Sequence, residues 1–109
     1  MRRAITIGNE KVELAASAAT PFIYQKIFHE DILRETQKDP ENVSNYIKLA
    51  FTMAKQAETE SSELMKGSVT YDDFMAWLDQ FEMLDIMDSL KDALALYQES
   101  RKGTSVPKK

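Results

Sequence analysis

The spacing of apolar residues changes once along this chain, and this change constrains the fold more than any other feature. Residues 5–7 and 12–14 alternate apolar and polar side chains, which is the period of a half-buried strand. Gly8 lies between the two runs and favours a tight turn. The pattern predicts a β-hairpin over residues 3–7 and 10–15. Because an isolated hairpin is marginally stable, it should pack on a helix or on another chain.

Helical spacing follows, and two Xaa-Pro pairs predict where helices begin. Thr20-Pro21 is expected to open the first helix, with Thr20 as its cap. Asp39-Pro40 has the same form and predicts a helix from Pro40 to about Glu58. Its apolar stripe is broad enough for the central helix of the core, with Asn45, Lys48, Thr52 and Lys55 expected on the solvent side.

Further predicted helix boundaries divide the helical part of the chain. The apolar pattern of the first helix fails at His29, which predicts a break and a short second piece capped by Asp31. Residues 59–67 either extend the central helix or form a loop that Gly67 ends. Thr70 begins a sequence typical of a capping box. A last break is expected near residues 80–84, where Asp85 can cap.

These elements predict a mostly helical α+β fold, with an N-terminal hairpin followed by four to five helices. Residues 1–102 are expected to form a single domain, and 103–109 a disordered basic tail. In the last helix the expected core stripe is Met83, Met87, Leu90, Leu94 and Tyr97. Leu84 and Leu96 lie off that stripe, so both are expected to be exposed.

The composition argues against catalysis. The chain has one histidine, no cysteine and three glycines, so thiolate metal sites and a Gly-rich phosphate loop are excluded. A Ser/His/Asp triad assembled by the fold stays open, but no nucleophile elbow is present. His29 is better interpreted as a surface or helix-end residue. We predict no enzyme, no cofactor and no metal, and the absence of an apolar run of 18 residues predicts no membrane span.

Charge is distributed unevenly along the chain. Residues 101–109 carry four basic side chains, whereas residues 71–100 carry eight acids against Lys91 alone. Such an acidic surface repels nucleic acid and favours a neutral or basic protein partner. Four acids share one face of the last helix, and a solvated face is favoured there over a cation site. These acids are Asp85, Asp88, Asp92 and Glu99.

The apolar stripes of the last two helices are mostly core, but their methionines also suit an adaptable contact surface. From these stripes and the adjoining acids we predict a partner-binding site, and from the hairpin we predict a self-association surface. The predicted partner-binding residues are Phe74, Trp77, Phe81, Leu84, Met87, Leu96, Asp85, Asp88 and Asp92. The predicted self-association residues are Ile5, Ile7 and Val12.

Several segments resemble the tail assembly chaperones of long-tailed phages and prophages of Gram-positive bacteria. The most specific is Ala18-Ala19-Thr20-Pro21, with Tyr24 four residues after the threonine. The Phe28 to Leu33 segment and the Tyr-Asp-Asp-Phe-Met-Ala-Trp-Leu-Asp-Gln-Phe stretch at 71–81 are also similar. The resemblance spans most of residues 5–100. Family members often have glycine after the phenylalanine, where this chain has His29.

The resemblance implies an assembly factor of the host bacterial cytoplasm that is not in the mature virion. Such a chaperone binds the tape measure protein, keeps it soluble and helps recruit major tail tube subunits, and it often has a longer form made by ribosomal frameshifting. A homo-oligomer is also expected. The alternative is a structural head–tail connector or tail completion subunit of the virion. A DNA-binding regulator is disfavoured by the acidic helices.

Overall fold

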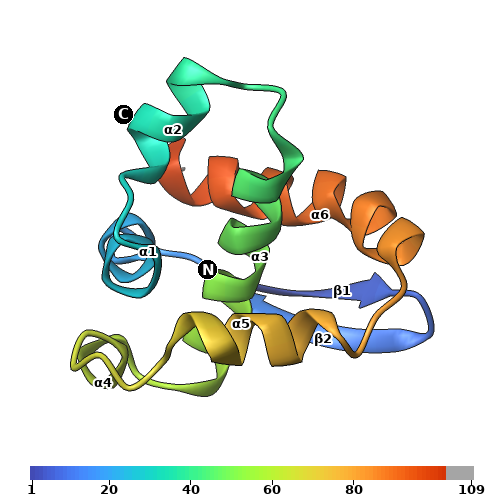
Figure 1. The fold of residues 1–109 in the computed structure, drawn as a ribbon, viewed down its shortest axis with the longest axis horizontal. Coiled ribbons are helices and arrows are strands. Elements are labelled where there is room, and N and C mark those ends of the chain that lie inside the picture. Colours follow the sequence, from blue (N-terminus) through green and yellow to red (C-terminus); the bar gives the residue numbers. More distant parts are fainter. Residues whose placement is uncertain (103–109) are drawn as a thin grey trace, which may run out of the picture.

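The computed structural model describes residues 1–102 and confirms the predicted α+β class, with an N-terminal hairpin followed by six helices (Figure 1). Strands β1 (Arg2–Ile7) and β2 (Glu10–Ala15) pair antiparallel around a two-residue turn. Gly8 adopts φ 64° in this turn, a backbone conformation that glycine tolerates best. The ladder extends one pair further, because Met1 and Ala16 exchange both backbone hydrogen bonds. The predicted tail at 103–109 lies outside the described residues.

Helix α1 (Thr20–Phe28) corrects the predicted cap. Ala19 is the N-cap residue, and Thr20 is the first helical residue. The Thr20 hydroxyl is fully buried and donates to Gln56 Oε1 at 2.7 Å, so it ties α1 to a later helix. The helix ends at His29, which has φ 59°. Helix α2 (Ile32–Lys38) follows, and Asp31 caps it as predicted by accepting from the backbone N–H of Leu33.

Helix α3 (Val43–Glu58) begins later than predicted, because Asn42 rather than Asp39 caps it. The Asn42 side chain accepts from the backbone N–H of Ser44 at 3.0 Å. The predicted solvent side is also wrong in part: Asn45 and Thr52 are buried. The helix packs against β2, α1 and α6, so little of its circumference is left to solvent. Its role as the central helix is confirmed.

The remaining helices are α4 (Ser61–Leu64), α5 (Tyr71–Leu78) and α6 (Met83–Lys102). The short α4 fills the segment for which the sequence left helix and loop open, and it brings the number of helices to six. Thr70 and Asp73 form the predicted capping box of α5. The break before α6 is confirmed, but Asp85 does not cap it, since α6 already begins at Met83.

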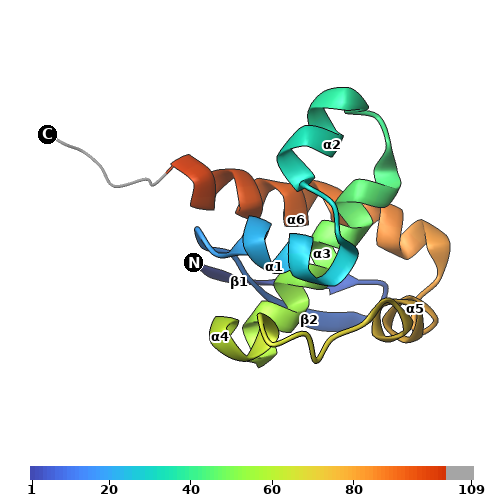
Figure 2. The same cartoon turned by 60° about the vertical axis from the view of Figure 1, so that its left-hand side comes forward.

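The core forms around α3, which contacts β2, α6, α1 and α5 and runs through the middle of the molecule (Figure 2). Aromatic rings connect α3 to α5: Phe51 of α3 has its ring centroid 5.2 Å from that of Phe74 and 5.5 Å from that of Trp77. Phe28 of α1 joins them at 5.1 Å from Phe74. Among the described residues, no helix is both long and apolar enough to cross a membrane.

Candidate functional site

The aromatic residues predicted to bind a partner are mostly internal. Phe74 and Trp77 are 4% and 8% exposed and pack on Phe51, so assigning them to a partner surface was wrong. Their burial has a simple cause: the face of α5 that carries them is the one that covers α3. Phe81 is half-buried, with its ring centroid 5.2 Å from that of Trp77. It lies where the α5 face meets the surface.

Helix α6 presents a different face to the core than the sequence predicted. Leu96 is fully buried, so its assignment to an exposed partner site was wrong. The buried residues are offset from the predicted stripe by roughly 90° around the helix, close to one residue step. Small Ser89 and Ala93 lie on the true core face, where they let α6 approach its neighbours. The buried residues of α6 are Ile86, Ser89, Ala93, Leu96 and Tyr97.

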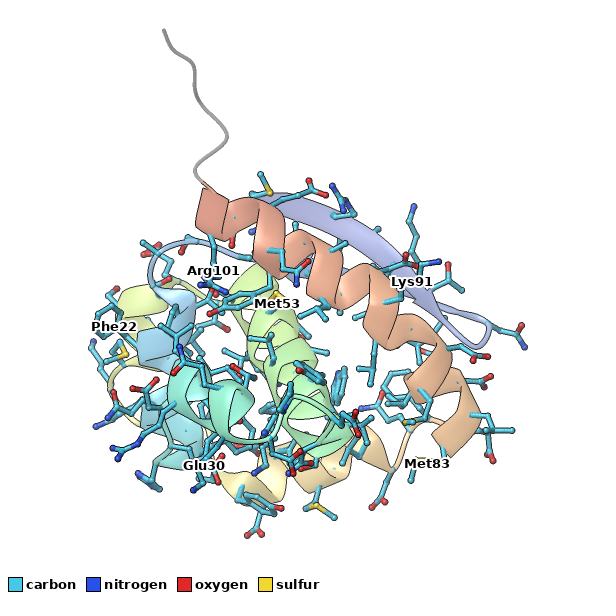
Figure 3. All side chains as sticks on the ribbon, turned by 90° about the horizontal axis from the view of Figure 1, so that it is seen from above. Phe22, Glu30, Met53, Met83, Lys91 and Arg101 are labelled. Atoms are coloured by element: carbon cyan, nitrogen blue, oxygen red, sulfur yellow. The ribbon has the colours of Figure 1, made fainter. Side chains whose placement is uncertain are left out.

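The same offset exposes the first turn of α6. Met83 is 69% exposed, Leu84 75% and Met87 37%. Residues three and four apart are neighbours on a helix surface, so these three side chains form one patch. Figure 3 places Met83 at the periphery of the molecule, where the chain enters α6. We call Met83, Leu84 and Met87 the α6 apolar patch. The sequence identified Leu84 and Met87 but assigned Met83 to the core.

Of the four acids predicted to share one face of α6, three lie near or act on the hairpin, and Asp88 lies beside the α6 apolar patch. Asp85 lies against the hairpin turn, because a Cβ placed on Gly8 would be 2.6 Å from its carboxylate oxygen. Glu99 accepts a hydrogen bond from Arg3 of β1 at 2.8 Å, and the charge of Asp92 also acts on Arg3. The hydrogen bond and the charge of Glu99 raise the pKa of Arg3. Asp88 is exposed on the side of the helix next to the α6 apolar patch.

Of the three predicted self-association residues, two are buried in the core and one is half-buried. Ile5 and Ile7 are 4% and 1% exposed and belong to the core of their own chain, so neither is a surface contact. Val12 is half-buried and lines a groove of about 400 Å³ between β2 and α5, with Trp77 and Phe81 on the opposite wall. We call this the β2–α5 groove. Lys55 and Glu58 of α3 also line it.

Two properties of the titratable residues of the described chain bear on chemistry: clustering as metal ligands and shifted pKa values. His29 is exposed at the end of α1, and the part of the chain that the structure describes holds no cluster of three potential metal ligands. Burial, together with Glu30, raises the pKa of Tyr24, whose hydroxyl donates to Glu30 Oε1 at 3.3 Å. Burial also raises the pKa of Tyr97. Its hydroxyl has no hydrogen-bond partner among the described residues.

Two candidate surfaces of the described chain combine apolar side chains with charge: the α6 apolar patch, whose side chains are exposed, and the β2–α5 groove, whose apolar residues are half-buried or buried. The sequence could indicate the first through its Met and Leu residues at a helix start. It could not indicate the second, because the groove joins residues from three separate elements. Compared with family models, curated proteins and solved structures, the chain shows no match.

Proposed function

We propose that this protein is a phage tail assembly chaperone that binds the tape measure protein in the host cytoplasm through the α6 apolar patch. Binding would keep that long chain soluble until major tail tube subunits assemble around it. The proposal rests on the sequence resemblance across residues 5–100 and on one structural observation. That observation is the exposure of Met83, Leu84 and Met87 at the start of α6.

The chemistry of the patch suits a helical client. Two of its three side chains are methionines, which are unbranched and adapt to different apolar partners. An amphipathic helix offers a stripe of apolar anchors three and four residues apart, and a patch with the same spacing is complementary to it. Exposed Asp88 and Glu82 beside the patch favour a client with basic residues flanking its apolar stripe.

A co-expression experiment tests the proposal. A tape measure protein, whose gene the proposal expects downstream of the gene for this chain, is expressed with the wild type or with Leu84→Asp, and its soluble fraction is measured. A charge in the patch should greatly reduce the soluble fraction, because an aspartate buried against an apolar client has no partner there. Phe22→Asp is the matched control, since Phe22 is 63% exposed and lies on the opposite side of the molecule (Figure 3).

Two results would contradict the proposal. One is a tape measure protein that stays equally soluble with Leu84→Asp and with Phe22→Asp. The other is abundant wild-type protein in purified virions by mass spectrometry, which would favour the head–tail connector or tail completion subunit. The nucleotide sequence adds an independent check: a chaperone gene should precede a tape measure gene and carry a slippery heptamer near its stop codon.

A further inference from the structure

The outer edge of β2 pairs with no other strand of the described chain. Helix α6 packs along β1, whereas β2 is the strand farther from α6 (Figure 1). The sheet has two strands, so the outer edge of β2 ends the ladder among residues 1–102. An open strand edge presents unpaired backbone N–H and C=O groups to any strand of suitable shape.

The register identifies which backbone groups point outward. Met1 and Ala16 exchange both of their backbone hydrogen bonds, and such pairs recur at every second position of an antiparallel ladder. Val12 therefore points its N–H and C=O toward Ile5. The outward-pointing groups of the central part of β2 belong to Lys11 and Glu13. No hydrogen bond from another element reaches them within the described chain.

We propose that β2 pairs antiparallel with β2 of a second copy, centred on Val12, to form a four-stranded sheet across a two-fold axis. In this register Lys11 of each copy lies opposite Glu13 of the other. Both are outward-pointing, so the two pairs exchange four backbone hydrogen bonds. The side chains of each pair lie on the same solvent-facing side of the sheet, where opposite charges attract.

The charge pattern selects this register over its neighbours. Shifting the two-fold axis by half a residue, to a point between Val12 and the next ladder position, breaks the pairing of outward-pointing groups. Shifting it by a full residue sets Lys11 opposite Lys11, or Glu13 opposite Glu13. Like charges directly opposite each other destabilise a strand pair. Only the register centred on Val12 makes both cross-strand pairs attractive.

The proposed pairing also brings apolar side chains into contact on the other side of the sheet. Val12 of the second copy lies opposite Val12, on the side of the sheet that faces the β2–α5 groove. There its side chain gains the apolar surface of Phe81, which is half-buried in the isolated chain. The interface is distinct from the α6 apolar patch, so the chain can pair with itself and bind a client at once.

Sedimentation velocity of charge-reversed variants tests the proposal. Wild type should sediment as a dimer of the 12.5 kDa chain. Lys11→Glu and Glu13→Lys each turn both attractive pairs into repulsive ones, which should raise the dissociation constant about tenfold. The double variant restores opposite charges and should recover dimerisation.

The sharpest arm mixes the two single variants. Each should self-associate weakly, because Lys11→Glu leaves two glutamates on the edge and Glu13→Lys leaves two lysines. In a mixed dimer both glutamates of one chain lie opposite the two lysines of the other. The mixture should therefore form a heterodimer at concentrations where each variant alone is mostly monomeric.

Lys91→Glu is the matched control for Lys11→Glu, because it makes the same charge change at an exposed position on α6. Circular dichroism verifies that every variant keeps the wild-type helix content. A wild type that remains monomeric at about 0.5 mM, where even a weak dimer is mostly occupied, would overturn the proposal. So would single variants that dissociate no more than Lys91→Glu, or a mixture of the two that shows no gain.

Discussion

Helices α3 and α6 are the two longest in the molecule, yet they use their apolar residues in different ways. Of the 16 residues of α3, nine are buried, including the polar Asn45, Thr52 and Gln56. The 20 residues of α6 bury a narrow face and leave Met83 and Leu84 among the most exposed apolar side chains. Hydrophobicity alone does not explain this contrast, because exposed Met83 and Leu84 of α6 are more apolar than the buried polar residues of α3.

Position in the fold explains the contrast. Helix α3 packs against the hairpin, α1 and α6, so most of its circumference meets another element and even polar side chains are buried. Gln56 accepts a hydrogen bond from Thr20 and donates one to Ser17 Oγ at 2.8 Å, which satisfies its buried amide. Helix α6 packs along β1 and α3 on one side. Helix α3 therefore stabilises the core, whereas the first turn of α6 leaves apolar side chains exposed to solvent.

The largest expected effect lies on α3. Phe51 is fully buried and its ring touches Phe28, Phe74 and Trp77. Phe51→Ala should lower the free energy of unfolding by about 3–5 kcal/mol, because it removes apolar contacts and leaves a cavity. Chemical denaturation measures the change. Phe22→Ala, at an exposed position on α1, should change it by less than about 0.5 kcal/mol. Equal losses for the two variants would refute the assignment of α3 to the core.

The second test compares two leucines within α6. Leu96→Ala should lower the free energy of unfolding by about 2–4 kcal/mol, since Leu96 is fully buried. Leu84→Ala should change it by less than about 0.5 kcal/mol, because Leu84 is 75% exposed. The same denaturation experiment measures both. If Leu84→Ala proved the more destabilising, the assignment of Leu96 to the core face of α6 and of Leu84 to its exposed face would be wrong.

The smallest expected effect concerns two buried phenols. Tyr24→Phe should lower the free energy of unfolding by about 1 kcal/mol at neutral pH, because it removes the hydrogen bond to Glu30. Tyr97→Phe should leave it nearly unchanged, since the hydroxyl of Tyr97 has no partner among the described residues. A loss at Tyr97 as large as at Tyr24 would show that the Tyr97 hydroxyl is bonded after all.

The pH dependence of the free energy of unfolding gives a second test of Tyr24 and Tyr97. Burial raises the pKa of both phenols above the ordinary value of 10.0. The unfolded chain therefore releases these protons first, and the free energy of unfolding should fall as the pH rises above about 10. Each Tyr→Phe variant should show a shallower fall than the wild type in unfolding measured across that range. An unchanged slope in both would mean that neither phenol is desolvated in the folded chain.

Local signals in the sequence predicted local structure well. The Gly8 turn, the Asp31 cap, the Thr70 capping box and the break before α6 were all identified, because each depends on residues close together in the chain. The errors at Thr20 and Asp39 have different causes. Both residues resemble helix caps, but Thr20 is bound to Gln56, and Asn42 offers a competing cap to α3.

Surfaces were predicted less well than elements. The stripe of α6 was offset because Ser89 and Ala93 contribute little hydrophobicity, although they lie where the helix approaches the core most closely. For the same reason Leu96 was expected at the surface and Met83 in the interior. The division of the hairpin residues into buried Ile5 and Ile7 and half-buried Val12 likewise required the packing of α3 and α6.

The sequence alone determined the fold class, the hairpin implied by its alternating residues and most helix boundaries, since these follow from backbone preferences over a few residues. It also supplied the resemblance on which the proposed function rests. Only the tertiary structure decided which apolar side chains face water. That choice depends on which elements pack against each helix face, and contacts between distant segments leave no periodic signal in either one. The α6 apolar patch and the open edge of β2 both result from it.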